Sequence, residues 1–173
     1  MSAADILLKR IKQDGAVNGE IIKVDHFLNH MVDPELIHTL ADDLAAQFKD
    51  LAVSKILTAE TSGIMLAQAI ALKLKVPFIY AKKKRPITMR EYFAAASYSF
   101  TKQESTTLYV SKEVLLATDR ILFIDDFLAK GSTLKAIEEI VTQAKATLVG
   151  AAVIINKSTR RDIKSILTLT DLQ

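Results

Sequence analysis

The sequence predicts an α/β protein with a doubly wound, mainly parallel β-sheet. Short apolar, β-branched runs alternate with segments of helical apolar spacing along the 173 residues, and this is the order of strand–helix–strand units. Half of the residues are hydrophobic, which is enough for one core. The length fits a single domain over residues 1–173. Ligands bind such sheets outside the carboxyl ends of the strands, so polar residues at those ends are the first candidates for a site.

The expected elements follow in order from apolar spacing and from turn and capping residues. A helix is expected over residues 3–13, a turn at Asn18-Gly19, and a helix from Asp33-Pro34 to about Phe48, because an acidic cap precedes proline at the first helical position. Strands are expected at 21–24, 53–58, 76–81, 107–110, 120–124, 148–155 and 165–169, and further helices at 64–74 and 133–145.

Residues 82–105 differ in character from the rest of the chain. They begin with the dense basic run Lys82-Lys-Lys-Arg85 and continue with polar and aromatic residues that keep no sustained period. Thr88 and Glu91 suit a capping box for one short helical turn. An irregular segment of this length is usually functional or mobile, so we expect a loop with a role in the site.

Composition excludes several classes of protein. The chain has no cysteine, which excludes disulfides and thiolate metal sites. It has no run of the roughly 18 apolar residues that a membrane span needs, and its amino-terminal segment reads as an amphipathic helix rather than a signal peptide. We therefore expect a cytoplasmic protein without a membrane partner. A net charge of +3 does not by itself indicate a nucleic-acid partner, and we expect none.

The strongest chemical pattern is Ile121-Leu-Phe-Ile-Asp-Asp-Phe-Leu-Ala-Lys-Gly-Ser-Thr133. An apolar strand runs into Asp125 and Asp126, whose carboxylates can accept hydrogen bonds from a vicinal diol or hold a divalent cation. The loop 129–133 then opens a helix, and its N–H groups and dipole suit a phosphate. The alternative is an ordinary turn with an acidic cap. The combination of apolar run, acidic pair and Gly-Ser-Thr helix start favours a ligand site.

Residues 121–133 resemble the phosphoribosyl-pyrophosphate (PRPP) motif of the type I phosphoribosyltransferases. Lys130 stands where that family usually has threonine, and Ser132 stands where it has a second glycine. Five segments in consistent order over residues 5–158 resemble, more narrowly, the bacterial xanthine phosphoribosyltransferases. They are Lys23-Val-Asp-His-Phe-Leu-Asn-His30, Glu60-Thr-Ser-Gly63, Ser97-Tyr-Ser-Phe-Thr-Lys-Gln103, Asp125-Asp-Phe-Leu-Ala129 and Asn156-Lys-Ser158.

The resemblance implies an enzyme of purine salvage. Such an enzyme transfers the 5-phosphoribosyl group from PRPP to xanthine, giving xanthosine 5′-monophosphate and pyrophosphate, with Mg²⁺ bound through PRPP and no firm protein ligand to the metal. It implies a homodimer, and a small hood over the sheet formed by residues 1–32 and 157–173. After Ser158 the family continues with a longer segment than the 159–173 present here, so we expect a shortened cover over the base pocket, closed by the strand at 165–169.

The resemblance also assigns roles to particular positions. Asp125 and Asp126, which would hold the ribose hydroxyls, and Glu60 are the implied catalytic residues. A mobile loop over residues 97–102 would close over the reacting centre. The implied base contacts are Ile22, Asn29 and Lys157. The implied PRPP contacts are Ala129, Lys130, Gly131, Ser132 and Thr133 for the 5′-phosphate, Thr61, Ser62 and Gly63 for the pyrophosphate, and Lys82 and Lys83, which would reach pyrophosphate across a dimer interface.

Without the resemblance, simpler interpretations stand beside these roles. Asn29 suits a turn cap, Lys157 a solvated surface lysine, and Glu60 an acid at a helix start. The basic run at 82–85 suits an exposed turn or a nucleic-acid patch. Three other functions are also open: the same reaction on guanine or hypoxanthine, a non-catalytic PRPP-binding regulator, and another Mg²⁺-dependent phosphate-handling protein. The lack of a G-x-x-x-x-G-K-[ST] motif disfavours the last of these.

Overall fold

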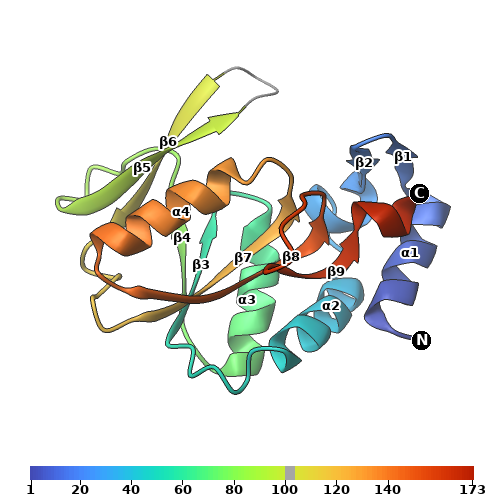
Figure 1. Cartoon of the computed structure of the whole chain (residues 1–173), viewed down its shortest axis with the longest axis horizontal. Helices are drawn as coiled ribbons and strands as arrows, with labels where there is room; N and C mark the ends of the chain where they lie inside the picture. Colours follow the sequence, from blue (N-terminus) through green and yellow to red (C-terminus); the bar gives the residue numbers. More distant parts are fainter. Residues whose placement is uncertain (100–103) are drawn as a thin grey trace.

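Five parallel strands form the central sheet of the computed structural model, which describes residues 1–99 and 104–173 (Figure 1). Their order across the sheet is β4-β3-β7-β8-β9, and each neighbouring pair is parallel. The strands are β3 (Lys55–Ala59), β4 (Phe78–Ala81), β7 (Arg120–Leu128), β8 (Thr147–Asn156) and β9 (Lys164–Thr168). The predicted doubly wound parallel sheet is confirmed.

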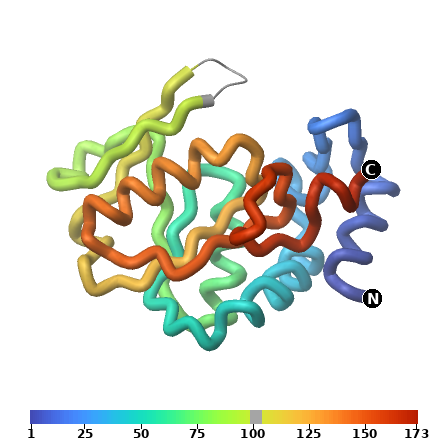
Figure 2. Tube along the Cα trace, viewed as in Figure 1, coloured from blue at the N-terminus to red at the C-terminus, as the bar shows by residue number. Residues whose placement is uncertain are grey.

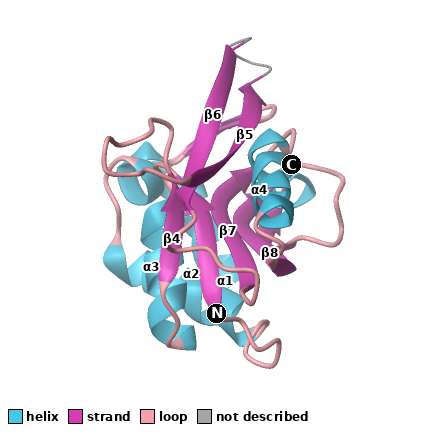
Figure 3. Ribbon diagram, turned by 90° about the vertical axis from the view of Figure 1, so that its left-hand side faces the viewer, coloured by secondary structure: helices cyan, strands magenta, loops and turns pink. Residues whose placement is uncertain are grey.

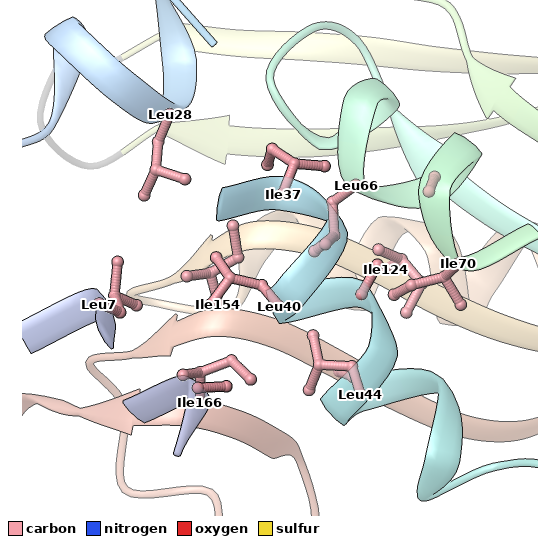
Figure 4. Close-up of a cluster of buried hydrophobic side chains, with 14 of the residues drawn as sticks. Leu7, Leu28, Ile37, Leu40, Leu44, Leu66, Ile70, Ile124, Ile154 and Ile166 are labelled. Carbon is pink, nitrogen blue, oxygen red and sulfur yellow. The ribbon is translucent and has the colours of Figure 1, made fainter. Parts of the chain in front are cut away.

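Helices cover both faces of this sheet, and the alternation of side chains along β7 shows how. Leu122 and Ile124 belong to the core cluster under α1 (Ala3–Asp14), α2 (Pro34–Ala46) and α3 (Gly63–Leu74), part of which Figure 4 shows. Ile121 and Phe123 belong to the cluster under α4 (Ser132–Gln143) on the opposite face. A strand buried on both faces must be apolar throughout, which explains the unbroken run Ile121–Ile124. Within the described residues, no helix is long and apolar enough to cross a membrane.

The amino-terminal and carboxyl-terminal segments lie together at one end of the molecule (Figure 2). Helix α1 contacts β9, and the short hairpin β1 (Ala16–Asn18) and β2 (Ile21–Lys23) follows it. A π-helical turn η1 (Asp25–Asn29) then leads to α2. The chain ends in a 3₁₀ turn η2 (Leu169–Leu172) after β9. The Asp33 carboxylate accepts hydrogen bonds from the Glu35 and Leu36 N–H groups, at 3.0 and 3.1 Å, which confirms the predicted cap.

The segment 82–105 corrects the sequence analysis. It contains no capping-box helical turn in its described part; Met89 N–H donates to Pro86 O in a simple turn. From residue 92 the chain forms β5 (Tyr92–Ser99), which pairs antiparallel with β6 (Glu104–Ser111). This hairpin projects beyond the sheet (Figure 3). The prediction failed because Tyr92-Phe-Ala-Ala-Ala-Ser is rich in alanine and lacks the alternation of large apolar and polar residues that marks a half-buried strand.

Candidate active site

A cavity of about 380 Å³ lies at the carboxyl ends of β3 and β7 and is flanked by the β5–β6 hairpin. This is the edge of a parallel sheet at which ligands are expected. The cavity brings together most of the predicted catalytic and PRPP-binding residues. Its lining residues are Ala59, Glu60, Ser62, Lys83, Ser97, Thr106, Leu108, Asp125, Asp126, Phe127, Ala129, Lys130, Ser132 and Thr133.

The two aspartates lie inside β7, whereas the sequence analysis placed them where the strand ends. The strand continues to Leu128, and Asp125 pairs with Val153 of β8. Asp126 N–H donates to Asp125 Oδ1 at 3.0 Å, and Phe127 N–H donates to Asp126 Oδ1 at 2.8 Å. These short local bonds hold both carboxylates against the backbone of β7. The strand, rather than a loop, therefore determines where their free oxygen lone pairs point.

Asp125 has an unusual electrostatic environment. Burial is the main reason that the pKa of its carboxyl group is raised well above 3.8, and repulsion from the neighbouring Asp126 carboxylate adds to the effect. The positive charge of Lys83 partly offsets this rise. A perturbed acid in a cleft is a frequent mark of a functional site.

Gly63 allows β3, β7 and α3 to come this close. A Cβ atom at this position would meet Thr58 Oγ1, and it would lie 2.8 Å from Asp125 Oδ1 and 3.3 Å from Asp125 Cα. Any side chain would therefore displace the Asp125 carboxylate or the start of α3. Gly63, which the resemblance placed in the pyrophosphate loop, is thus required because α3 packs closely against Asp125.

Two helices begin at this cavity without a side-chain cap. Ser62 precedes α3, and Gly131, with φ of 76°, precedes α4. Neither helix start receives a side-chain hydrogen bond from the described residues. Uncapped N–H groups and the positive ends of two helix dipoles therefore face the cavity, together with the hydroxyls of Ser132 and Thr133. Such helix starts bind phosphate groups.

Of the predicted charged residues near the start of α3, Glu60 and Lys83 line the cavity and Lys82 does not. Glu60 Oε2 accepts a 2.8 Å hydrogen bond from Lys83 N–H, and both residues line the cavity. Lys82 does not line it: its ammonium lies 5.0 Å from the centre of the Tyr80 ring. The peptide bond Glu60-Thr61 is cis. The two lysines of the predicted pair thus point to different places.

The predicted base contacts lie beside the cavity rather than in its lining. The Lys157 ammonium donates to Glu20 O at 3.0 Å and lies 5.3 Å from the centre of the Phe127 ring, which does line the cavity. Asn29 ends η1, and its Oδ1 atom is buried without a hydrogen-bond partner among the described residues. Ile22 packs against the same core cluster as Phe127.

Four cavity residues were missed by the sequence analysis, and the first is Ala59, the last residue of β3. Thr106 and Leu108 belong to β6 and line the cavity because the hairpin leans over it, and the misread segment 82–105 gave no signal for this. Phe127 could have been found, since it follows the acidic pair directly. Ser97 of the predicted closing loop lies on β5 and lines the cavity, whereas residues 100–102 of that loop lie outside the described residues.

Fold and site together define a phosphoribosyltransferase of type I, and comparison with known proteins agrees. Residues 31–169 match the phosphoribosyl transferase domain family. The fold is similar to adenine phosphoribosyltransferase from Thermoanaerobacter pseudethanolicus (TM-score 0.77, 19% identity, covering 93% of this chain and 99% of that one). It is also similar to the enzyme from Saccharomyces cerevisiae (TM-score 0.76, 20% identity, covering 94% and 99%).

Sequence relatives are more specific. A xanthine phosphoribosyltransferase from Heliobacterium modesticaldum is 45% identical over 90% of this chain and 83% of its own length. One from Moorella thermoacetica is 43% identical over 91% of this chain and 81% of its own. The chain belongs to the xanthine phosphoribosyltransferase family, as the five sequence segments predicted.

Proposed function

We propose that this protein transfers the 5-phosphoribosyl group of PRPP to xanthine, giving xanthosine 5′-monophosphate and pyrophosphate in purine salvage. One observation carries the proposal: a single cavity joins the acidic pair Asp125-Asp126 to two helix starts that no described side chain caps. PRPP carries a diol between two phosphorylated positions, so its groups match this arrangement. Relatives with more than 40% identity that bear the name xanthine phosphoribosyltransferase support the choice of base.

The ribose-5-phosphate half of PRPP would lie along β7 and the start of α4. Asp125 and Asp126 would accept hydrogen bonds from the 2′- and 3′-hydroxyls. The N–H groups of residues 129–133 would bind the 5′-phosphate, with the side chains of Ser132 and Thr133 as further donors. This phosphate loop comprises Ala129, Lys130, Gly131, Ser132 and Thr133.

The pyrophosphate half would lie at the start of α3. Backbone N–H groups of Thr61, Ser62 and Gly63, with the Lys83 ammonium, would stabilise the charge that builds up on the leaving group. Mg²⁺ bound through PRPP would supply further stabilisation of this charge. Glu60 and Asp126 line the same cavity and carry oxygen donors of the type that Mg²⁺ prefers. No group of three metal-ligating side chains is found among the described residues, so the ion would be held mainly through PRPP.

The purine would lie beside Phe127, under the hood formed by residues 1–32 and 157–173. Asn29 Oδ1 is buried and has no hydrogen-bond partner among the residues that the structure describes, which is costly for a polar atom. We propose that it accepts a hydrogen bond from a ring N–H of xanthine. The Lys157 ammonium donates to Glu20 O and keeps further N–H groups for the electron-rich edge of the base. Ile22 would supply an apolar contact.

Catalysis would rest on positioning and on exclusion of water. As the bond from the anomeric carbon to pyrophosphate breaks, the ribose gains positive charge beside Asp125 and Asp126. A ring nitrogen of xanthine, which releases its proton to solvent, forms the new bond to the same carbon. Water must be kept from that carbon. The β5–β6 hairpin, which already lines the cavity through Ser97, Thr106 and Leu108, would close over it.

We also propose that the protein is a homodimer and that each chain, residues 1–173, forms a single domain. Strand β4 is the edge of the sheet, and its Tyr80 is 37% exposed. Lys82 lies beside Tyr80 and outside the cavity of its own chain, which suits a residue that reaches the pyrophosphate site of a partner across this edge. Closed two-fold dimers are the commonest oligomers. The cytoplasmic location expected from the sequence stays a prediction.

The double variant Asp125→Asn/Asp126→Asn tests the assignment of the acidic pair. Both asparagines keep the side-chain volume, so the fold should be retained, while turnover with PRPP and xanthine should fall by on the order of a hundredfold or more, as for removal of preorganised polar groups. Steady-state nucleotide formation and circular dichroism measure the two quantities. Wild-type rates in the double variant would remove the pair from the mechanism.

A further inference from the structure

We infer that Asn156 is a positioning residue for the purine base: its buried side chain fixes the turn that presents Lys157. The inference rests on the proposed function, in which Lys157 contacts the base. It adds a residue that does not touch the substrate and that acts through its neighbour.

Asn156 is the last residue of β8 and is only 4% exposed. Its amide makes three hydrogen bonds, all to the turn that follows. The Nδ2 group donates to Arg160 O at 2.8 Å, and Oδ1 accepts from Ser158 N–H at 2.9 Å and from Ser158 Oγ at 2.7 Å. The Ser158 hydroxyl in turn accepts a bond from Arg160 N–H at 3.1 Å. A buried amide with three hydrogen bonds to the same turn favours one backbone path for residues 156–160.

Lys157 lies inside this turn, but its side chain takes no part in it. Its N–H donates to Leu128 O at 2.7 Å, which ties the turn to the end of β7. Its ammonium points to Glu20 O and over the Phe127 ring. The turn is therefore held by Asn156 and Ser158, while the cation between them is directed toward the cavity wall.

A second set of contacts anchors the far end of the turn. The Arg160 guanidinium binds both carboxylate oxygens of Asp162, at 3.1 and 2.6 Å, and Glu138 of α4 at 3.2 Å. Helix α4 also begins at the proposed phosphate loop. The turn that carries the proposed base contact is thus linked by an ion pair to the helix whose start would bind the phosphate.

Asn156→Ala removes the three hydrogen bonds and leaves Lys157 on a loose turn. Binding xanthine must then order Lys157, and the entropy lost by ordering about one residue weakens binding by on the order of tenfold. We expect KM for xanthine to rise by that factor while KM for PRPP stays near the wild-type value. Ser158→Ala removes only the two hydrogen bonds of the Ser158 hydroxyl, to Asn156 Oδ1 and Arg160 N–H. It should raise KM for xanthine by a smaller factor.

A double-mutant cycle with Lys157→Ala tests whether Asn156 affects base binding through Lys157 or by destabilising the protein in general. If Asn156 acts through Lys157, Asn156→Ala should raise KM for xanthine in the wild-type background and add nothing in the Lys157→Ala background. Additive effects would contradict the inference. Ser54→Ala is the matched stability control, because it also removes hydrogen bonds, to Asp119 and Arg120 at the opposite end of the sheet; it should leave KM for xanthine unchanged.

The outcomes distinguish the inference from the function on which it rests. If the wild-type protein forms no xanthosine monophosphate, the proposed function fails first. If it does form the product, and KM for xanthine is unchanged in Asn156→Ala and Ser158→Ala, only the positioning role is overturned. Should Asn156→Ala not fold, Ser158→Ala in the same cycle decides the question alone.

Discussion

Asp125 lies where a charged carboxylate lowers stability. Burial first, and then the charge of Asp126, raise its pKa in the folded protein above 3.8. The folded state therefore holds the proton more tightly than the unfolded state. The stabilisation linked to this proton is complete below pH 3.8 and is lost as the pH rises through the folded-state pKa. At neutral pH the carboxylate of Asp125 lowers stability, although the proposed function requires it.

This gives a prediction for Asp125→Asn, measured by urea unfolding. At neutral pH the variant should be more stable than the wild type, and the gap should shrink as the pH falls toward 3.8. Asp119→Asn is a control for which the change in stability should have the opposite sign. Burial alone would raise the pKa of Asp119, but hydrogen bonds from Lys55, Leu116 and Ser54 lower it overall, so that variant should be less stable at neutral pH. A gap for Asp125→Asn that does not depend on pH would contradict the electrostatic account.

At the scale of elements, the β5–β6 hairpin depends on α4 for its position. Gln143 Nε2 donates to Ala94 O at 2.8 Å, and Ala94 N–H donates to Gln143 Oε1 at 3.4 Å. Gln143→Ala should speed amide hydrogen exchange in β5 by on the order of tenfold, since each bond contributes about 1 kcal/mol. Thr142→Ala should leave β5 unchanged, because within the described residues the Thr142 hydroxyl bonds only Glu138 O of its own helix. Equal exchange in both variants would show that Gln143 does not hold the hairpin.

Elements differ in how far the sequence could predict them. The central strands and helices follow from apolar runs and from caps such as Asp33, because burial on both faces of a parallel sheet leaves little choice of residue. The strand predicted at 107–110 lies in β6, but β5 was missed because alanine carries little information about which face of a sheet it takes. In the site, the cluster around Asp125 and Asp126 is local in sequence and was predictable. The contact of Lys157 with Glu20 spans 137 residues and is formed only by the fold.

At the scale of the whole molecule, the proposed dimer would share its active sites across the β4 edges. Lys82→Ala and Asp125→Asn/Asp126→Asn should each be nearly inactive. Mixing the two under conditions that exchange subunits should restore part of the activity, because one site of each mixed dimer then has a normal acidic pair and a normal partner lysine. No recovery, with subunit exchange shown by native mass spectrometry, would place Lys82 in its own chain's site or outside catalysis.

The central claim is that this cavity transfers a phosphoribosyl group to xanthine, and a competition assay tests it most directly. The protein is given PRPP, Mg²⁺ and equal concentrations of xanthine, guanine and hypoxanthine, and the nucleotides formed are identified by mass spectrometry. Our account predicts that xanthosine 5′-monophosphate forms fastest and that its formation stops when Mg²⁺ is chelated. A product mixture dominated by the guanine or hypoxanthine nucleotide, or no nucleotide at all, would contradict it.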